Sequence, residues 1–331
     1  MAEQQFTDNP ILNSPYLEPT RHWALDEKGE PVGNCQKGRR SSAYLIPVPV
    51  TRRRKQRRLG LENHGDSYKS KELANVNFIR KMVKEWRQRP PGKWGVTPAT
   101  ERLLSYWREN NLSPKLFFCQ IEAAETLIWL NEVAPNTPMG KALLADIKNS
   151  NEEANPGLFR LASKMATGAG KTTVMAMLIA YYTINKSRSP RSERFTNNFL
   201  IITPGITIRD RLRVLLPEDT ESYYKKRGIV PPDMWRDMEK ARVVIQNYHV
   251  LRHRETRNLP PAARNILRGN GDNINTLETD EEMLVRACRD ILCDKSAIVI
   301  NDEAHHCYQR ADRDEEAKPP PPSKMAMKQR K

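Results

Sequence analysis

The sequence lacks a hydrophobic run long enough to cross a bilayer. Its longest apolar stretch, Val174–Tyr182, falls far short of the roughly 20 residues that a membrane helix needs. The first residues, MAEQQFTDNP, lack the charged-then-apolar order of a secretory signal. We therefore expect a cytoplasmic protein that has no membrane partner.

The sequence also lacks a disulfide framework and an internal repeat. Its five cysteines form no C-x-x-C pair, and an odd number spread over 331 residues fits free thiols in a reducing compartment. No similarity recurs at a period of 20 to 50 residues, which excludes solenoids and propellers. Only 38% of the residues are hydrophobic and 29% are charged, so part of the chain must lie outside any packed core.

Acidic residues are absent between Glu30 and Glu62, where nine cations gather. The net charge of the chain is +15, and an excess of this size attracts polyanions, nucleic acid first among them. One interpretation of the segment is an arm that tracks phosphates without reading sequence. A solvated basic linker is an equal alternative. The cations are Lys37, Arg39, Arg40, Arg52, Arg53, Arg54, Lys55, Arg57 and Arg58.

Composition and periodicity divide the chain into four parts. Residues 1–68 are basic and rich in Pro, Gly and Arg, which predicts a largely irregular segment with at most a short strand at 43–50. Residues 69–114 show helical spacing and predict a helical extension. Residues 115–310 predict the main domain. Residues 311–331 contain four consecutive prolines and predict a disordered tail.

Three helices are expected before the main sheet. Apolar residues from Leu73 to Trp86 recur at helical spacing, and Thr97 followed by Pro98 is typical of an N-cap and first turn. A third helix is predicted from Gln120 to about Val133, and a turn follows at 155–157.

The main domain alternates short apolar runs with helical stretches. The helix Lys171–Asn185 is apolar nearly all round, and Thr279 with Glu282 forms a capping box that opens another helix. Strands without polar alternation are typical of a parallel sheet that helices cover on both faces. The sequence therefore predicts an α/β fold. Its expected strands are 158–165, 199–203, 242–245 and 297–301.

The run MATGAGKT at 165–172 lies between an expected strand and an apolar helix. Its glycines allow successive N–H groups to point at phosphate oxygens at a helix start. Lys171 would reach the β- and γ-phosphates of ATP, and the Thr172 hydroxyl would bind Mg²⁺. Met165 replaces the first Gly of the strict pattern, and a plain glycine-rich turn is the alternative. The predicted nucleotide-binding residues are Thr167, Gly168, Ala169, Gly170, Lys171, Thr172 and Thr173.

A second motif, NDEAHH at 301–306, ends the last expected strand. Hydrolysis of a phosphoanhydride needs one carboxylate near the metal and another group that activates water. We predict that Asp302 binds Mg²⁺ through water and that Glu303 activates the attacking water, with Lys171 as the third catalytic residue. An incidental acidic strand end is the alternative. Zinc is disfavoured, because neighbouring residues such as His305 and His306 point to opposite sides of an extended segment.

Polar residues elsewhere are candidate contacts to base or nucleic acid. Gln120 can pair with N6 and N7 of adenine, but a helix-start Gln that bonds its own backbone is the alternative. A second group opens a helix after an expected strand and could grip strand phosphates, with a plain strand-to-helix turn as the alternative. Its members are Thr203, Gly205, Thr207 and Arg209.

Together these motifs resemble those of superfamily 2 helicases of the DEAD/DEAH-box-like group, and most closely the Res subunit of type III restriction enzymes. The segment LFFCQIEAA at 116–124 resembles the adenine-reading Gln motif, and FLIITPGIT at 199–207 resembles motif Ia. The resemblance covers about 115–310 and the N-terminal text NPILNSPYLEPTRHW. It implies a RecA-like P-loop NTPase fold, use of ATP and Mg²⁺, double-stranded DNA as substrate and a modification subunit as partner. It also implies that His305 couples the nucleotide site to a neighbouring domain.

The resembled family has a second RecA-like domain and a nuclease domain, and no motif of either follows 301–306. We therefore expect the ATP- and Mg²⁺-binding N-terminal half of a DNA helicase or translocase, nearly inactive alone and completed by another half. The alternative is a non-enzymatic fragment that binds nucleotide and DNA without productive turnover.

Overall fold

A parallel sheet forms the centre of the protein. The computed structural model describes residues 10–26, 29–48, 67–109, 114–254, 278–288, 291 and 296–304. Strands β5 (Asn198–Thr203), β6 (Arg242–Asn247) and β7 (Ile298–Asn301) lie in the order β6-β5-β7, and both pairings are parallel. The expected strands at 199–203, 242–245 and 297–301 are therefore confirmed.

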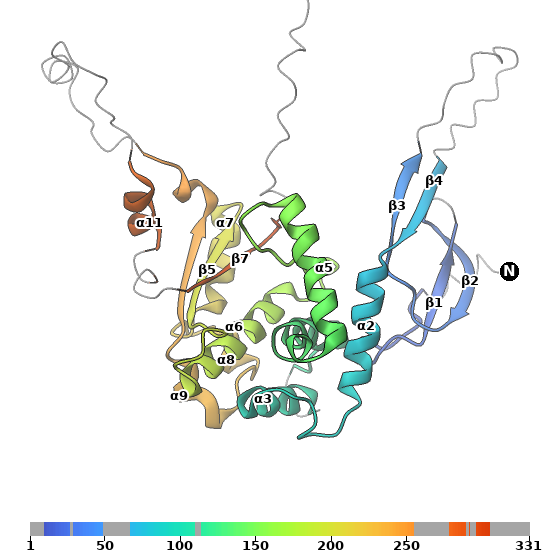
Figure 1. The fold of residues 1–331 in the computed structure, drawn as a ribbon, viewed down its shortest axis with the longest axis horizontal. Helices are drawn as coiled ribbons and strands as arrows, with labels where there is room; N and C mark the ends of the chain where they lie inside the picture. The colour runs from blue at the N-terminus through green and yellow to red at the C-terminus, as the bar shows by residue number, and fades with distance from the viewer. Residues whose placement is uncertain are drawn as a thin grey trace, which may run out of the picture.

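Helices cover both faces of this sheet, as Figure 1 shows for α6 and α11. Phe199 and Ile201 of β5 belong to the core that α6 (Lys171–Arg188) helps to build. Leu200, which points the other way, packs with residues of α11 (Asp280–Cys288). This burial on both faces explains why the strands read as continuous apolar runs. The expectation of an α/β fold with a helix-flanked parallel sheet is confirmed.

The expected strand at 158–165 is wrong. The segment is irregular, and its apolar side chains Leu158, Phe159 and Leu161 are 53%, 50% and 46% exposed. A strand needs a neighbour to satisfy its backbone groups, and apolar composition alone does not supply one. Within the described residues, β5 has a neighbour on both edges and β7 pairs only with β5. The segment reaches the phosphate loop without joining the sheet.

The N-terminal part contains two antiparallel hairpins, which lie on the far side of α2 from the sheet (Figure 1). Strand β1 (Arg21–Leu25) pairs with β2 (Pro31–Lys37), and β3 (Ala43–Val48) pairs with β4 (Ser67–Glu72). The strand expected at 43–50 is confirmed as β3, but the expectation of at most this one strand before residue 68 is wrong, because β1 and β2 also lie there. Hairpin strands satisfy each other's backbone groups locally, so they form with little apolar sequence.

The helical extension and the main domain share one core. Helices α2 (Ala74–Arg87), α3 (Pro98–Arg108) and α4 (Phe118–Ile128) confirm the three expected helices. Thr97 caps α3, since its hydroxyl accepts the N–H of Thr100 at 3.2 Å. Residues of these helices are buried in the same cluster as residues of α6. Helix α5 (Pro138–Ala154) was not expected, and only two of its residues are buried.

Ion pairs join α2, α3 and the N-terminal hairpins to α4. The carboxylate of Glu125 has no exposed surface and accepts from Arg87 at 2.5 Å and from Arg108 at 2.8 Å. The Arg39 guanidinium donates to both oxygens of Glu122, at 2.5 and 2.6 Å. Arg39 of the basic segment therefore holds the hairpins to α4. Residues 52–58 of that segment lie outside the described residues.

The N-terminal text NPILNSPYLEPTRHW contacts the start of α4. The Pro15 carbonyl accepts the N–H of Phe118 at 2.9 Å, which satisfies one of the unpaired donors of the first helical turn. The rings of Tyr16 and Phe117 lie 5.6 Å apart. This segment thus packs against the helix that carries Gln120.

The remaining elements are short. They are η1, a π-helical turn (Trp129–Val133), η2 (Ala134–Asn136), α7 (Ile206–Arg211), η3 (Leu212–Leu215), α8 (Tyr223–Lys226), η4 (Pro232–Met234), α9 (Trp235–Met238) and η5 (Tyr248–Leu251). In the part of the chain that the structure describes, no helix has both the length and the apolar character that a bilayer requires.

Candidate functional site

The phosphate loop forms a turn that only its glycines allow readily. Gly168 and Gly170 have φ angles of 78° and 82°, in the left-handed region that side chains disfavour. Gly170 is the N-cap of α6, so the loop delivers backbone N–H groups to the start of an 18-residue helix. Thr167 and Gly168 are exposed, whereas Thr172 is half-buried and Thr173 is buried. The arrangement is suited to an anion such as a phosphate.

Gln120 contacts this loop although 49 residues separate it from Ala169. Its side chain is buried; Nε2 donates to the Ala169 carbonyl at 3.1 Å, and Oε1 accepts the N–H of Phe117 at 2.9 Å. Both the oxygen and the nitrogen of the Gln120 amide are therefore hydrogen-bonded to backbone groups. This arrangement agrees with the alternative in which Gln120 bonds to the backbone instead of contacting adenine. A Cβ atom on Gly170 would lie 2.1 Å from Nε2, so any side chain at this position would have to displace the Gln120 amide.

Lys171 and Glu303 join the two motifs. The Lys171 ammonium donates to Oε1 of Glu303 at 2.9 Å, across 132 residues of sequence, and each side chain is about a third exposed (35% and 34%). This hydrogen bond raises the pKa of Lys171. Glu303 is the one non-glycine with positive φ (53°) among the described residues. Such a conformation costs on the order of 1–3 kcal/mol and is typical of functional sites.

Asp302 lies beside this pair at the end of β7. Its N–H donates to the Ile202 carbonyl of β5 at 3.0 Å, which extends the sheet to the edge of the site. Burial raises the pKa of Asp302, the charge of Glu303 raises it further, and the charge of Lys171 opposes both. Two carboxylates and one ammonium thus meet at the carboxyl ends of parallel strands, where open α/β sheets bind their ligands.

The donors at this edge fit Mg²⁺ better than a softer metal. Thr172 and Asp302 offer a hydroxyl and a carboxylate oxygen, and Mg²⁺ is usually held by one or two carboxylates together with substrate phosphates and waters. No group of three or more His, Cys, Asp or Glu side chains gathers among the described residues. The residues present therefore suit a metal that arrives with a nucleotide.

The candidates for nucleic-acid contact divide into buried and surface residues. Thr203 is buried, and its hydroxyl donates to the Gly205 carbonyl at 3.1 Å. Gly205 precedes α7, where Thr207 is exposed and Arg209 pairs with its neighbour Asp210 at 3.1 Å. Thr203 thus shapes the turn, while Thr207 and Arg209 lie at the surface. His305, the predicted coupling residue, lies outside the described residues.

Sequence reasoning missed Tyr223, the first residue of α8, and Arg227, which directly follows this helix. Arg227 donates from NH1 to the Thr173 hydroxyl at 3.3 Å, so it contacts the first turn of α6 directly. No motif surrounds these residues. Only an arginine and a tyrosine four apart, which are neighbours on a helix, could have drawn attention to them.

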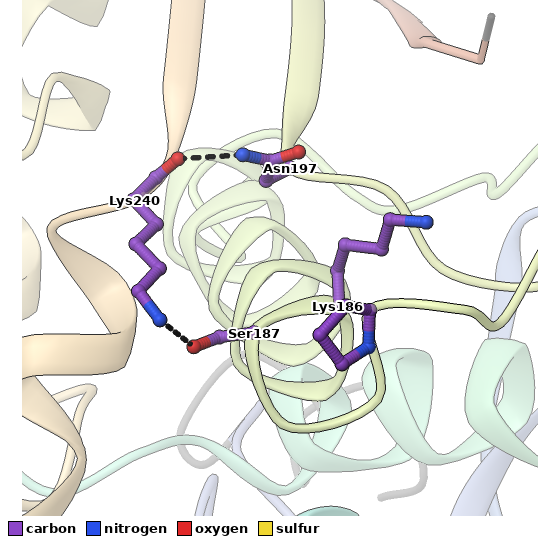
Figure 2. Close-up of a pocket in the computed structure, with 5 residues that line it drawn as sticks. Lys186, Ser187, Asn197 and Lys240 are labelled. Carbon is purple, nitrogen blue, oxygen red and sulfur yellow. Dashed lines mark hydrogen bonds between the residues drawn. The ribbon is translucent and has the colours of Figure 1, made fainter. Parts of the chain in front are cut away.

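A separate pocket of about 260 Å³ lies at the other end of the sheet (Figure 2). Asn197 and Lys240, which line it, precede β5 and β6, so the pocket is at the amino ends of these strands. Lys240 donates to the Ser187 hydroxyl at 2.7 Å, and Asn197 donates to the Lys240 carbonyl at 2.8 Å. None of the predicted site residues lines this pocket.

The helix-flanked parallel sheet, the phosphate loop and the acidic end of β7 define a RecA-like domain of the superfamily 2 helicase type. A comparison with known protein families matches residues 114–322 to the family described as type III restriction enzyme, res subunit. The match covers more than half of the 331 residues, so the chain belongs to this family. No curated protein and no solved structure matches the chain significantly.

Proposed function

We propose that the domain binds Mg²⁺-ATP at the carboxyl end of its sheet and serves a DNA helicase or translocase of a type III restriction system. The observation that carries the proposal is the 2.9 Å contact between Lys171 and Glu303. It joins the phosphate loop to the DEAH segment, although the two are 132 residues apart. In a site that hydrolyses a nucleotide, the cation that binds the phosphates and the carboxylate that activates water must both lie close to the reacting group.

The residues of the site have separate roles in this proposal. The amides from Thr167 to Thr173 bind phosphate oxygens, and Lys171 leaves Glu303 to neutralise them. Thr172 and Asp302 hold Mg²⁺, which when bound screens the phosphate charge. Glu303, released from Lys171, orients a water molecule and accepts its proton. Gln120 reads adenine only after its Nε2 leaves the Ala169 carbonyl.

The proposed substrate and protein partners follow from the family to which the chain belongs and from its net positive charge. Double-stranded DNA is the proposed polyanion, which Gly205, Thr207 and Arg209 contact at the surface while Thr203 holds their turn. A modification subunit and a second motor domain are the proposed protein partners, and His305 is the proposed link to the latter. We keep the proposed division of the chain into four parts. These are a basic N-terminal segment (1–68), a helical extension (69–114), the ATP-binding domain (115–310) and a C-terminal tail (311–331).

The test measures binding of a fluorescent ATP analogue with Mg²⁺. Lys171→Ala should weaken binding by at least about 2 kcal/mol, or roughly thirtyfold, because the variant cannot form a charge-assisted hydrogen bond to phosphate. Lys164→Ala is the matched control, since this exposed lysine precedes the loop. Wild-type affinity in a folded Lys171→Ala protein would contradict the proposal.

A second measurement separates motor activity from mere binding. With this chain alone, double-stranded DNA should raise the rate of ATP hydrolysis only a little. With the second motor domain added, DNA should raise the rate strongly, and Glu303→Gln should abolish that increase while leaving nucleotide affinity unchanged. Binding without any hydrolysis, under all conditions and with candidate partners added, would favour the alternative of a nucleotide- and DNA-binding protein.

A further inference from the structure

Arg227 is an unassigned cation that lies against the phosphate loop. It follows α8, and its NH1 donates to the Thr173 hydroxyl at 3.3 Å. NH2 donates to the Tyr223 hydroxyl at 3.2 Å, and the guanidinium lies 4.1 Å from the centre of the Tyr223 ring. The ring and the two hydroxyls thus fix the position of a charge beside the first turn of α6.

The partners of this arginine differ from those of several other half-buried arginines in the protein. Arg39, Arg87 and Arg108 each pair with a carboxylate. Arg227 has hydroxyl partners, and no ion pair within the described part of the chain includes it. A half-buried cation whose neighbours are neutral is electrostatically unsatisfied, and an anionic ligand supplies what it lacks.

Arg227 lies on one particular side of the phosphate loop. Successive helical residues are about 100° apart, so Thr173 points roughly 200° around α6 from Lys171. A Cβ on Gly170 would lie 3.6 Å from the Thr173 hydroxyl and 2.1 Å from Nε2 of Gln120. Arg227 therefore lies on the Gln120 side of the loop, away from the contact between Lys171 and Glu303.

Resting on the proposed function, we propose that Arg227 is a second phosphate-binding cation of the nucleotide site, oriented by Tyr223. Its ligand is a phosphate of a nucleoside di- or triphosphate other than the terminal one, because Lys171 and Glu303 occupy the opposite side of the loop. The contact would be present with ADP and with ATP. It is consequently distinct from groups that sense only the γ-phosphate.

The experiment compares Arg227→Gln and Arg227→Lys in binding of fluorescent ADP and ATP analogues with Mg²⁺. Glutamine keeps a donor for the Thr173 hydroxyl but removes the charge. Affinity should therefore fall at least about tenfold, and the factor should be similar for ADP and ATP. Lysine keeps the charge and should restore part of the affinity. The Gln variant should also show a shallower dependence of affinity on salt, which a purely structural role would not change.

Arg236→Gln is the matched control, because this arginine is exposed on α9. Wild-type affinity in Arg227→Gln, together with loss of binding in Lys171→Ala, would overturn this inference and leave the proposed function standing. A larger effect on ATP than on ADP would place Arg227 at the terminal phosphate and would also overturn it. No binding by the wild-type chain would refute both proposals.

Discussion

The contact between Gly170 and Gln120 makes a sharp prediction about stability. A Cβ on Gly170 would lie 2.1 Å from Nε2 and 3.3 Å from Cδ of Gln120. Gly168 has nearly the same backbone conformation, with φ 78° against 82°, but a Cβ there would meet nothing within 4 Å. The two alanine substitutions therefore share the backbone cost and differ in the clash.

The free-energy cost of the backbone conformation can therefore be separated from the cost of the clash with Gln120. A side chain in the left-handed region costs about 1–2 kcal/mol, so Gly168→Ala should destabilise the protein by that amount. Gly170→Ala should also displace the Gln120 amide from the Ala169 carbonyl. A buried polar group that loses its partner costs about 1–3 kcal/mol more.

The assay is urea unfolding followed by tryptophan fluorescence, without nucleotide, in wild-type and Gln120→Ala backgrounds. The excess cost of Gly170→Ala over Gly168→Ala should be present in the wild type and should vanish when Gln120 is alanine. Equal costs for the two glycines would refute the reasoning. An excess that survives Gln120→Ala would also refute it, because the clash would then lie elsewhere.

Three further predictions concern ionic groups. Hydrogen bonds from Arg286 lower the pKa of Glu278 from about 4.5 to about 2. This carboxylate therefore stabilises α11 fully above about pH 4.5, and the stabilisation is lost as pH falls towards 2. Hydrogen exchange of α11 should show this pH dependence, and Glu278→Gln should flatten it. Glu125→Gln should cost about 3 kcal/mol or more in urea unfolding, because two arginines lose a buried carboxylate, and a cost below about 1 kcal/mol would show that the arginines find water. Replacing the six cations of residues 52–58 by glutamine should flatten the slope of log DNA affinity against log salt by about 0.9 for each phosphate that the cations neutralise, and an unchanged slope would identify a linker.

Local signals were sufficient to predict the centre of the fold. The continuous apolar runs of β5, β6 and β7, and the apolar helix α6, each follow from a few neighbouring residues. The phosphate loop and the acidic motif were predicted separately. Because both belong to the carboxyl edge of a parallel sheet, the approach of Lys171 to Glu303 follows from the fold class rather than from any spacing.

The features that the sequence did not predict depend on distant partners. The run 158–165 is as apolar as a strand, but hydrophobicity does not supply a neighbour for its backbone. Gln120 and Ala169 meet because α4 packs against α6, and no sequence interval encodes that distance. No sequence pattern marks Glu125 as buried, because its two arginine partners come from α2 and α3.

The docking of the N-terminal hairpins by Arg39 and Glu122 has a consequence for the order of synthesis. These residues are 83 positions apart, so at about 5–20 residues per second the ribosome needs roughly 4–17 s to make the second after the first. During that interval the segment of Pro15 and Tyr16 has no α4 to contact. The segment around Pro15 and Tyr16 must therefore wait, without its packing partner, for a helix that translation has not yet reached.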